Sequence, residues 1–108
     1  MNIKELITVG KDYKYLAANG VLSPKDQFVL IDVSGGAITL TLPPLLECVG
    51  MIYCLQIIAG AANCVLAVPG NEADNYAAIE ALDMDAVGDH LVLLATPRKW
   101  AILSNGIA

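Results

Sequence analysis

The ten residues 35–44, GGAITLTLPP, constrain the fold more than any other stretch of the sequence. Between a glycine pair and a proline pair, the apolar residues Ile38, Leu40 and Leu42 alternate with small or polar ones. Because successive side chains of a β-strand point to opposite faces, this pattern predicts a strand with one apolar face. That face must be buried against another layer of the same chain or against a partner.

The rest of the chain is a series of short apolar runs separated by turn residues. Residues 34–36 separate the first two of these runs and residues 96–99 the last two, so each pair is predicted to form a hairpin. Short strands at such spacing are typical of a β-sandwich, a jelly roll or a small barrel. The expected strands are residues 27–33, 37–42, 51–58, 64–68, 90–95 and 100–104.

Two segments leave their local structure open. In the alanine-rich residues 75–86, Tyr76, Ile79 and Leu82 have helical spacing, but strand or loop context can override helix propensity. Residues 3–9 fit either a helical stripe or an edge strand. The sequence therefore predicts an all-β protein in which one short helix remains an option.

The chain length sets the domain organisation. A length of 108 residues implies one domain with a core of its own. We therefore predict a small β-sandwich-like or jelly-roll-like domain over residues 23–108, preceded by an N-terminal arm or edge segment over residues 1–22.

Charged residues are scarce for a domain of this size. They make up 16% of the chain, whereas about 25% is typical of globular domains. A small domain has a large surface, and some predicted strands are apolar on both faces. The second apolar faces must be covered by the N-terminal segment, by residues 75–86 or by another copy of the chain. Because charge is also scarce, we expect part of the surface to be covered by a partner, through self-association.

Neither nucleic acid nor a membrane is expected as a partner. The net charge is −5, and the basic pairs Lys11/Lys14 and Arg98/Lys99 make no basic stripe of the kind that binds nucleic acid. No run of about 18 uncharged apolar residues occurs, and the N-terminus lacks the apolar centre of a secretory signal. We expect a protein that is made, or assembled, in a cytoplasm.

The sequence offers little chemistry. No nucleotide-binding loop, nucleophile elbow or zinc-protease motif occurs. The cysteines at 48, 54 and 64 are expected to be free thiols packed as small hydrophobes, and the single His90 cannot complete a zinc set. We therefore expect no catalytic residue, cofactor or metal, and no enzyme. Trp100 could stack on a ligand, although a lone Trp at a strand start is more often a core or interface anchor.

Three stretches of the chain together resemble a known β-module. Residues 29–43 read VLIDVSGGAITLTLP, residues 50–70 contain GMIY, IIAGAAN and VPG, and residues 88–103 contain GD, LVLL and WAIL. In this order they resemble a module of bacteriophage virion proteins, of the kind found in tail fibres, tailspikes and small capsid decoration (cement) proteins. The resemblance spans residues 28–104. It departs from the common module at residues 96–99, where a Gly-Thr-Asn turn is usual.

The resemblance implies a virion structural part that works as a homotrimer or homodimer and has no catalytic residues. Because Met1 begins a short chain without a fibrous shaft, we expect a capsid decoration or cement protein that bridges capsid subunits. A tail-fibre or tail-tip component is the alternative, and a small-ligand or sugar-binding β-module is the third. The expected location is the virion, assembled in the host bacterial cytoplasm, with the major capsid protein or tail proteins as further partners. The interface candidates are Ile3, Leu6, Ile7, Tyr13, Tyr15 and Trp100.

Overall fold

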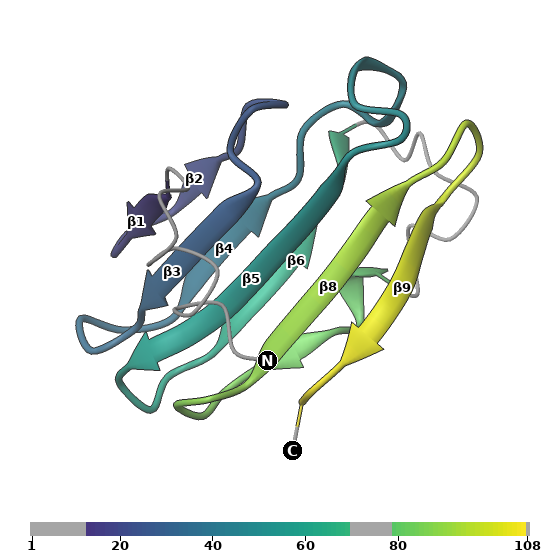
Figure 1. Ribbon diagram of the computed structural model, residues 1–108. Coiled ribbons are helices and arrows are strands. Elements are labelled where there is room, and N and C mark those ends of the chain that lie inside the picture. Colours follow the sequence, from purple (N-terminus) through teal and green to yellow (C-terminus); the bar gives the residue numbers. More distant parts are fainter. Residues whose placement is uncertain (1–12, 70–78, 108) are drawn as a thin grey trace.

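The computed structural model of the chain describes residues 13–69 and 79–107 and is predominantly β (Figure 1). One short 3-10 turn, η1 (Leu45–Glu47), lies between the fourth and fifth strands. The structure confirms the prediction of a β-rich fold and arranges the strands in two mixed sheets. The strands are β1 (Lys14–Leu16), β2 (Gly20–Val21), β3 (Phe28–Asp32), β4 (Ile38–Thr41), β5 (Ile52–Ala59), β6 (Cys64–Ala67), β7 (Asp83–Met84), β8 (His90–Ala95) and β9 (Trp100–Asn105).

Successive strands alternate between the two sheets from β1 to β6. The five-stranded sheet has the order β1-β3-β5-β8-β9, and the four-stranded sheet has the order β2-β4-β6-β7. The chain therefore winds in three coils, and each coil contributes one strand to each of the two sheets. The coils are β1–β2, β3–β4 and β5–β6. Strands of neighbouring coils pair in parallel. After β6 the pairing becomes antiparallel, for β6 with β7, β5 with β8 and β8 with β9.

The predicted hairpin of residues 27–33 with residues 37–42 is wrong. The corresponding strands β3 and β4 lie in different sheets, and each pairs with strands of the neighbouring coils instead. The physical reason is burial, because the apolar face of β4 packs across the core against the face of β3 that carries Val29 and Ile31. Parallel pairing also differs from the antiparallel pattern of a jelly roll. The second predicted hairpin, residues 90–95 with 100–104, is confirmed by the antiparallel pair β8–β9.

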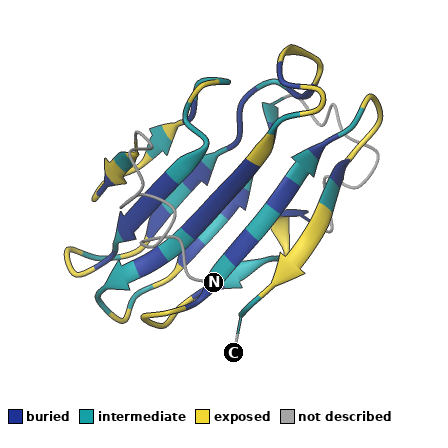
Figure 2. Cartoon of the chain, viewed as in Figure 1, coloured by how far each residue is buried: buried dark blue, intermediate teal, exposed yellow. Residues whose placement is uncertain are grey.

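The core lies between the two sheets (Figure 2). The register aligns Leu16, Ile31 and Ile57 across β1, β3 and β5, and all three are buried. Trp100 and Tyr53 make an edge-to-face contact, with ring centroids 5.5 Å apart and planes at 78°. The Tyr53 hydroxyl donates a hydrogen bond of 2.5 Å to the carbonyl oxygen of Pro24. The large core side chains therefore join the coils to the antiparallel strands.

The described part of the N-terminal segment belongs to the same folded unit. Its strands β1 and β2 form one edge of each sheet, and Leu16 and Leu22 are buried in the core. Residues 3–9 lie outside the described residues. Of residues 75–86, those from 79 onwards are described: residues 79 and 80 are helical, and residues 83 and 84 form β7.

Candidate interaction surfaces

Each sheet turns one face to the core and one face outward, and the outward faces of the two sheets differ. On the five-stranded sheet, the register aligns Phe28 with Cys54 and Cys54 with Val92, and it aligns Ile52 with Leu94. The polar residues Gln56 and His90 lie on the same outward face, in register with Leu30. We call this surface the outer apolar face. Its residues are Phe28, Leu30, Ile52, Cys54, Ile58, Val92 and Leu94.

The outer apolar face contains a hydrophobic cluster that is separate from the core. Leu30 and Cys54 are only 8% and 9% exposed, and Phe28, Ile58 and Val92 pack against them. Ile52, on the same face, is 44% exposed. The central strands of this sheet are therefore apolar on both sides, which is typical of a sheet with a layer on each face. Such a surface marks a site where a further layer can pack.

The outward face of the four-stranded sheet carries smaller and more polar side chains. The register aligns Thr39 with Val65 and Val65 with Asp83, and it aligns Thr41 with Ala67. The Asp83 carboxylate accepts a hydrogen bond of 3.0 Å from the side-chain amide of Asn63. This composition is typical of a sheet face in contact with water.

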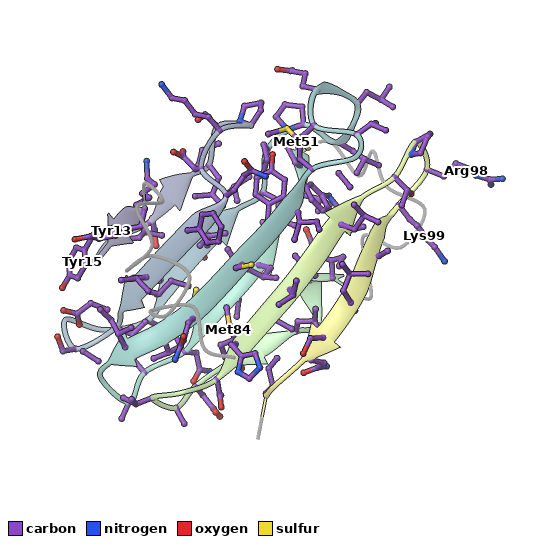
Figure 3. All side chains as sticks on the ribbon, viewed as in Figure 1. Tyr13, Tyr15, Met51, Met84, Arg98 and Lys99 are labelled. Atoms are coloured by element: carbon purple, nitrogen blue, oxygen red, sulfur yellow. The ribbon has the colours of Figure 1, made fainter. Side chains whose placement is uncertain are left out.

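The exposed tyrosines of the N-terminal region lie at the β1 edge of the five-stranded sheet (Figure 3). Tyr13 is 55% exposed and Tyr15 is 53% exposed. The Tyr15 hydroxyl donates a hydrogen bond to the carboxylate of Asp32, at the end of β3. Two predicted interface residues are therefore at the surface, and one of them also ties β1 to β3.

The carboxylate of Asp32 accepts several hydrogen bonds. The Ser34 backbone N–H donates at 2.8 Å and the Ser34 hydroxyl donates at 2.5 Å to one oxygen, and Tyr15 donates to the other. The hydrogen bond from the Ser34 hydroxyl, followed by that from Tyr15, lowers the pKa of Asp32 because both favour the charged form. The same carboxylate raises the pKa of Tyr15.

Of the four other predicted interface residues, the structure describes only Trp100. Ile3, Leu6 and Ile7 lie outside the described residues. Trp100 is fully buried in the core, so its side chain is available neither for a partner nor for stacking on a ligand. The sequence left a core role and an interface role open for this residue, and the structure places it in the core.

The open edge at β9 was missed from the sequence. In the described part of the chain, the other edge strands are β1 with three residues and β2 and β7 with two each, whereas β9 has six. On β9, Ile102 is 41% exposed and Leu103 is 53% exposed. The available signal was the run WAILSN, which contains neither a charge nor a proline. Charged residues and prolines are the types with which natural proteins often protect an edge strand, so their absence marks β9 as unprotected by its sequence.

Among the described residues, the chemically reactive side chains form no recognisable site. The three cysteines are buried thiols outside any disulfide, as predicted, and burial followed by the nearby Asp83 charge raises the pKa of Cys64 to about 12. The Nδ1 atom of His90 lies 3.1 Å from the carbonyl oxygen of Gly88. A hollow of about 450 Å³ lies beside the β8–β9 turn and is lined by residues 96–99. Within residues 13–69 and 79–107, no group of three or more His, Cys, Asp or Glu side chains could hold a metal ion.

No helix in the part of the chain that the structure describes is long and apolar enough to span a membrane. No protein-family model, curated protein or solved structure matches the chain.

Proposed function

We propose that the chain is a structural component of a bacteriophage virion, and specifically a capsid decoration or cement protein that bridges neighbouring capsid subunits. The observation that carries this proposal is the outer apolar face, with its second hydrophobic cluster around Leu30 and Cys54. The resemblance of residues 28–104 to virion β-modules supports the same class of function. A particle protein of this kind acts through the surface it buries, and the proposal assigns it no catalysis.

The physical basis of the proposal is the area that an apolar sheet face can bury. We treat the fold as a β-sandwich-like unit whose five-stranded sheet faces the capsid. A standard protein interface buries about 1,600 Å² in total, and an apolar patch supplies its centre. Because a shell contains many equivalent sites, even a modest affinity at each one reinforces the whole particle.

The proposed partners are the major capsid protein and further copies of this chain, as a homotrimer or homodimer. The N-terminal segment, with Ile3, Leu6 and Ile7, is proposed as the arm that reaches a neighbouring subunit. The exposed Tyr13 and Tyr15 lie where this arm joins the sheet. The protein would be assembled onto the virion in the cytoplasm of the host bacterium.

A tail-fibre or tail-tip component is the second candidate, and the winding of the chain favours it. From β1 to β6, the coils stack in parallel in both sheets. Stacked coils of this kind contact only their neighbours and can be continued along one axis, as in solenoid proteins. This geometry suits a segment of an elongated fibre as well as a compact decoration protein.

The test compares particles assembled with the wild-type chain, without it, and with Val92→Lys. Val92 is a half-buried member of the outer apolar face, so a charge there should reduce binding to the capsid. Thr39→Lys, on the outward face of the other sheet, makes the same change in charge and serves as the matched control. Circular dichroism of the isolated variants checks that both are folded.

The cement function predicts that complete particles survive heat or chelation better than particles without the protein. Val92→Lys should occupy fewer sites and protect less, while Thr39→Lys should match the wild type. Equal resistance of all particles, with labelled protein found only on the tail, would refute the cement function and favour the fibre. A label found on neither capsid nor tail would refute both.

A further inference from the structure

The β9 edge of the five-stranded sheet is long and is covered by none of the described residues. β9 has no described strand on its outer side, and residues 102–105 are all exposed. Unpaired N–H and C=O groups along such an edge form a template for another strand. The edge strands β1, β2 and β7 have two or three residues each, which leaves an added strand few groups with which to pair.

We propose that β9 is a dimerisation edge, on which the β9 strand of a second copy of this chain pairs antiparallel about a two-fold axis. The two five-stranded sheets then form one continuous sheet across the interface. Such strand addition draws its affinity from main-chain hydrogen bonds and from the side chains at the edge. Ile102 and Leu103 are the apolar side chains that the contact covers.

The identity of the partner follows first from the composition of the strand. The run WAILSN has no charged residue, so two copies meet along the edge without like-charge repulsion. A two-fold interface must be complementary to itself, and an uncharged strand meets this requirement.

The charges at the two ends of the hairpin favour the antiparallel direction. Arg98 and Lys99 lie at the β8–β9 turn, which is the end where β9 begins (Figure 3). At the other end, the Gly106 N–H donates to the His90 carbonyl, and the exposed acid Asp85 precedes β8. The carboxylate of Asp89 is buried and accepts hydrogen bonds from the backbone N–H groups of Asp85 and Ala86, so Asp85 is the acid that a partner can reach. Antiparallel pairing carries the basic turn of one copy toward the acidic end of the other. Parallel pairing would instead place the two basic turns side by side.

A bulge limits the strength of the contact. Val92 is aligned with Ser104 and Leu93 with Ile102, so Leu103 is an extra residue on β9. Bulges bend a strand and interrupt its ladder. The regular ladder open to a partner is therefore short, and we expect a dissociation constant in the micromolar range.

This inference specifies the contact between copies that the proposed function leaves open, and it holds whether or not the chain binds a capsid.

The test is sedimentation velocity of the full chain over about 1 to 100 μM, on both sides of the expected dissociation constant. Leu103→Lys puts a charge on the edge and should raise the dissociation constant of the dimer at least about tenfold. Val21→Lys is the matched control: it makes the same change in charge at a 66% exposed residue of the two-residue edge strand β2. It should leave the dimer intact.

Two further measurements test the direction of pairing and the place of the contact. Replacing Arg98 and Lys99 together by Glu should weaken the dimer several-fold in low salt, and this loss should shrink in high salt because screening removes it. Hydrogen exchange of the β9 amides should slow as the protein concentration rises.

Four results would overturn the proposal. They are a monomer at 100 μM, a trimer in place of the dimer, a dimer that Leu103→Lys leaves unchanged, and equal loss of the dimer in Val21→Lys and Leu103→Lys. Thermal melts of each variant separate loss of pairing from loss of folding. Failure of the chain to bind phage particles would leave this proposal unaffected, because every measurement above is made on the isolated chain.

Discussion

The two halves of this small protein are built by different rules. In residues 14–67, which we call the coil region, strands adjacent in the sequence lie in different sheets, so no strand pairs with its neighbour in the sequence. In residues 83–105, the hairpin region, β8 and β9 are adjacent in the sequence and pair with each other. The comparison teaches that a turn between two strands does not by itself reveal whether they pair.

The two regions also end differently. The coil region ends in the short edge strands β1 and β2, and side chains hold β1 in place. The Lys14 ammonium lies 3.6 Å from the Asp26 carboxylate, and the Tyr15 hydroxyl donates to Asp32. The hairpin region ends in β9, whose exposed residues are uncharged. Side-chain contacts therefore fasten β1 to the rest of the five-stranded sheet, whereas β9 is the edge that we propose to pair with a second copy.

The largest expected effect tests whether the two regions are separate folding units. Trp100 of the hairpin region packs on Tyr53 of the coil region within one shared core. Trp100→Ala should lower the free energy of unfolding of the whole domain by about 4 kcal/mol, because it leaves a large cavity. Chemical denaturation followed by circular dichroism should show one transition. Two transitions would mean that the regions unfold separately, and Ile102→Ala, at an exposed site on the same strand, controls for changes in β9 itself.

The next effect concerns the winding of the coil region alone. Gly60 has a φ of +93°, and a Cβ at this position would lie 2.3 Å from the backbone nitrogen of Ser34. Gly60→Ala should therefore cost about 3 kcal/mol, through backbone strain and the forced separation of two coils. Gly36 has a φ of +126° but open space around it, so Gly36→Ala should cost about 1 kcal/mol from strain alone. Gly35→Ala has neither problem and should be nearly neutral, so equal losses for all three variants would contradict this account.

The sequence allowed prediction of the longer strands and of the β8–β9 pair, but not of the strand partners in the coil region. Alternation located the apolar face of β4, because a two-residue period is a local property. Pairing in the coil region depends on distant contacts: Lys14 is aligned with Val29, and Val29 with Leu55, so the second coil is longer than the first. Coils of unequal length leave no fixed repeat in the sequence. β2 and β7, with two residues each, are too short to show any period.

The candidate surfaces were predicted less completely than the strands. The shortage of charge indicated a covered surface, and strands apolar on both faces indicated where it lies. The composition did not separate Trp100, which is buried, from Tyr13 and Tyr15, which are exposed. Aromatic residues serve both cores and interfaces, and only the register shows which face of the sheet each one occupies.

A smaller effect tests the local turn of the hairpin region. The Thr96 hydroxyl donates a hydrogen bond of 2.7 Å to the Lys99 carbonyl and accepts one of 3.0 Å from the Lys99 N–H. Thr96→Val keeps the shape of the side chain and removes both bonds, so it should lower the free energy of unfolding by about 1 kcal/mol. Thr96→Ser keeps the hydroxyl and should retain most of the stability. A Ser variant as unstable as the Val variant would show that the methyl group, and not the hydrogen bonds, supports the turn.

The smallest effect is a pH dependence confined to the edge of the coil region. Hydrogen bonds from Ser34 and Tyr15 lower the pKa of Asp32 in the folded protein. A carboxylate whose folded pKa is depressed contributes stability that is fully present above its unfolded pKa, about 3.9. The stability that the Asp32 carboxylate contributes is lost as the pH falls through the pKa of Asp32 in the folded protein. Below pH 4, the melting temperature of the wild type should therefore fall by more than that of Asp32→Asn. In an NMR titration, Tyr15→Phe should bring the pKa of Asp32 back toward its ordinary value.

Hydrogen exchange compares the two ends of the sheet. Since β1 is held at the sheet edge by the contact between Tyr15 and Asp32, the amides of β1 should exchange faster in acid than those of β9. Equal acceleration at both edges would contradict the contrast between the two ends of the sheet.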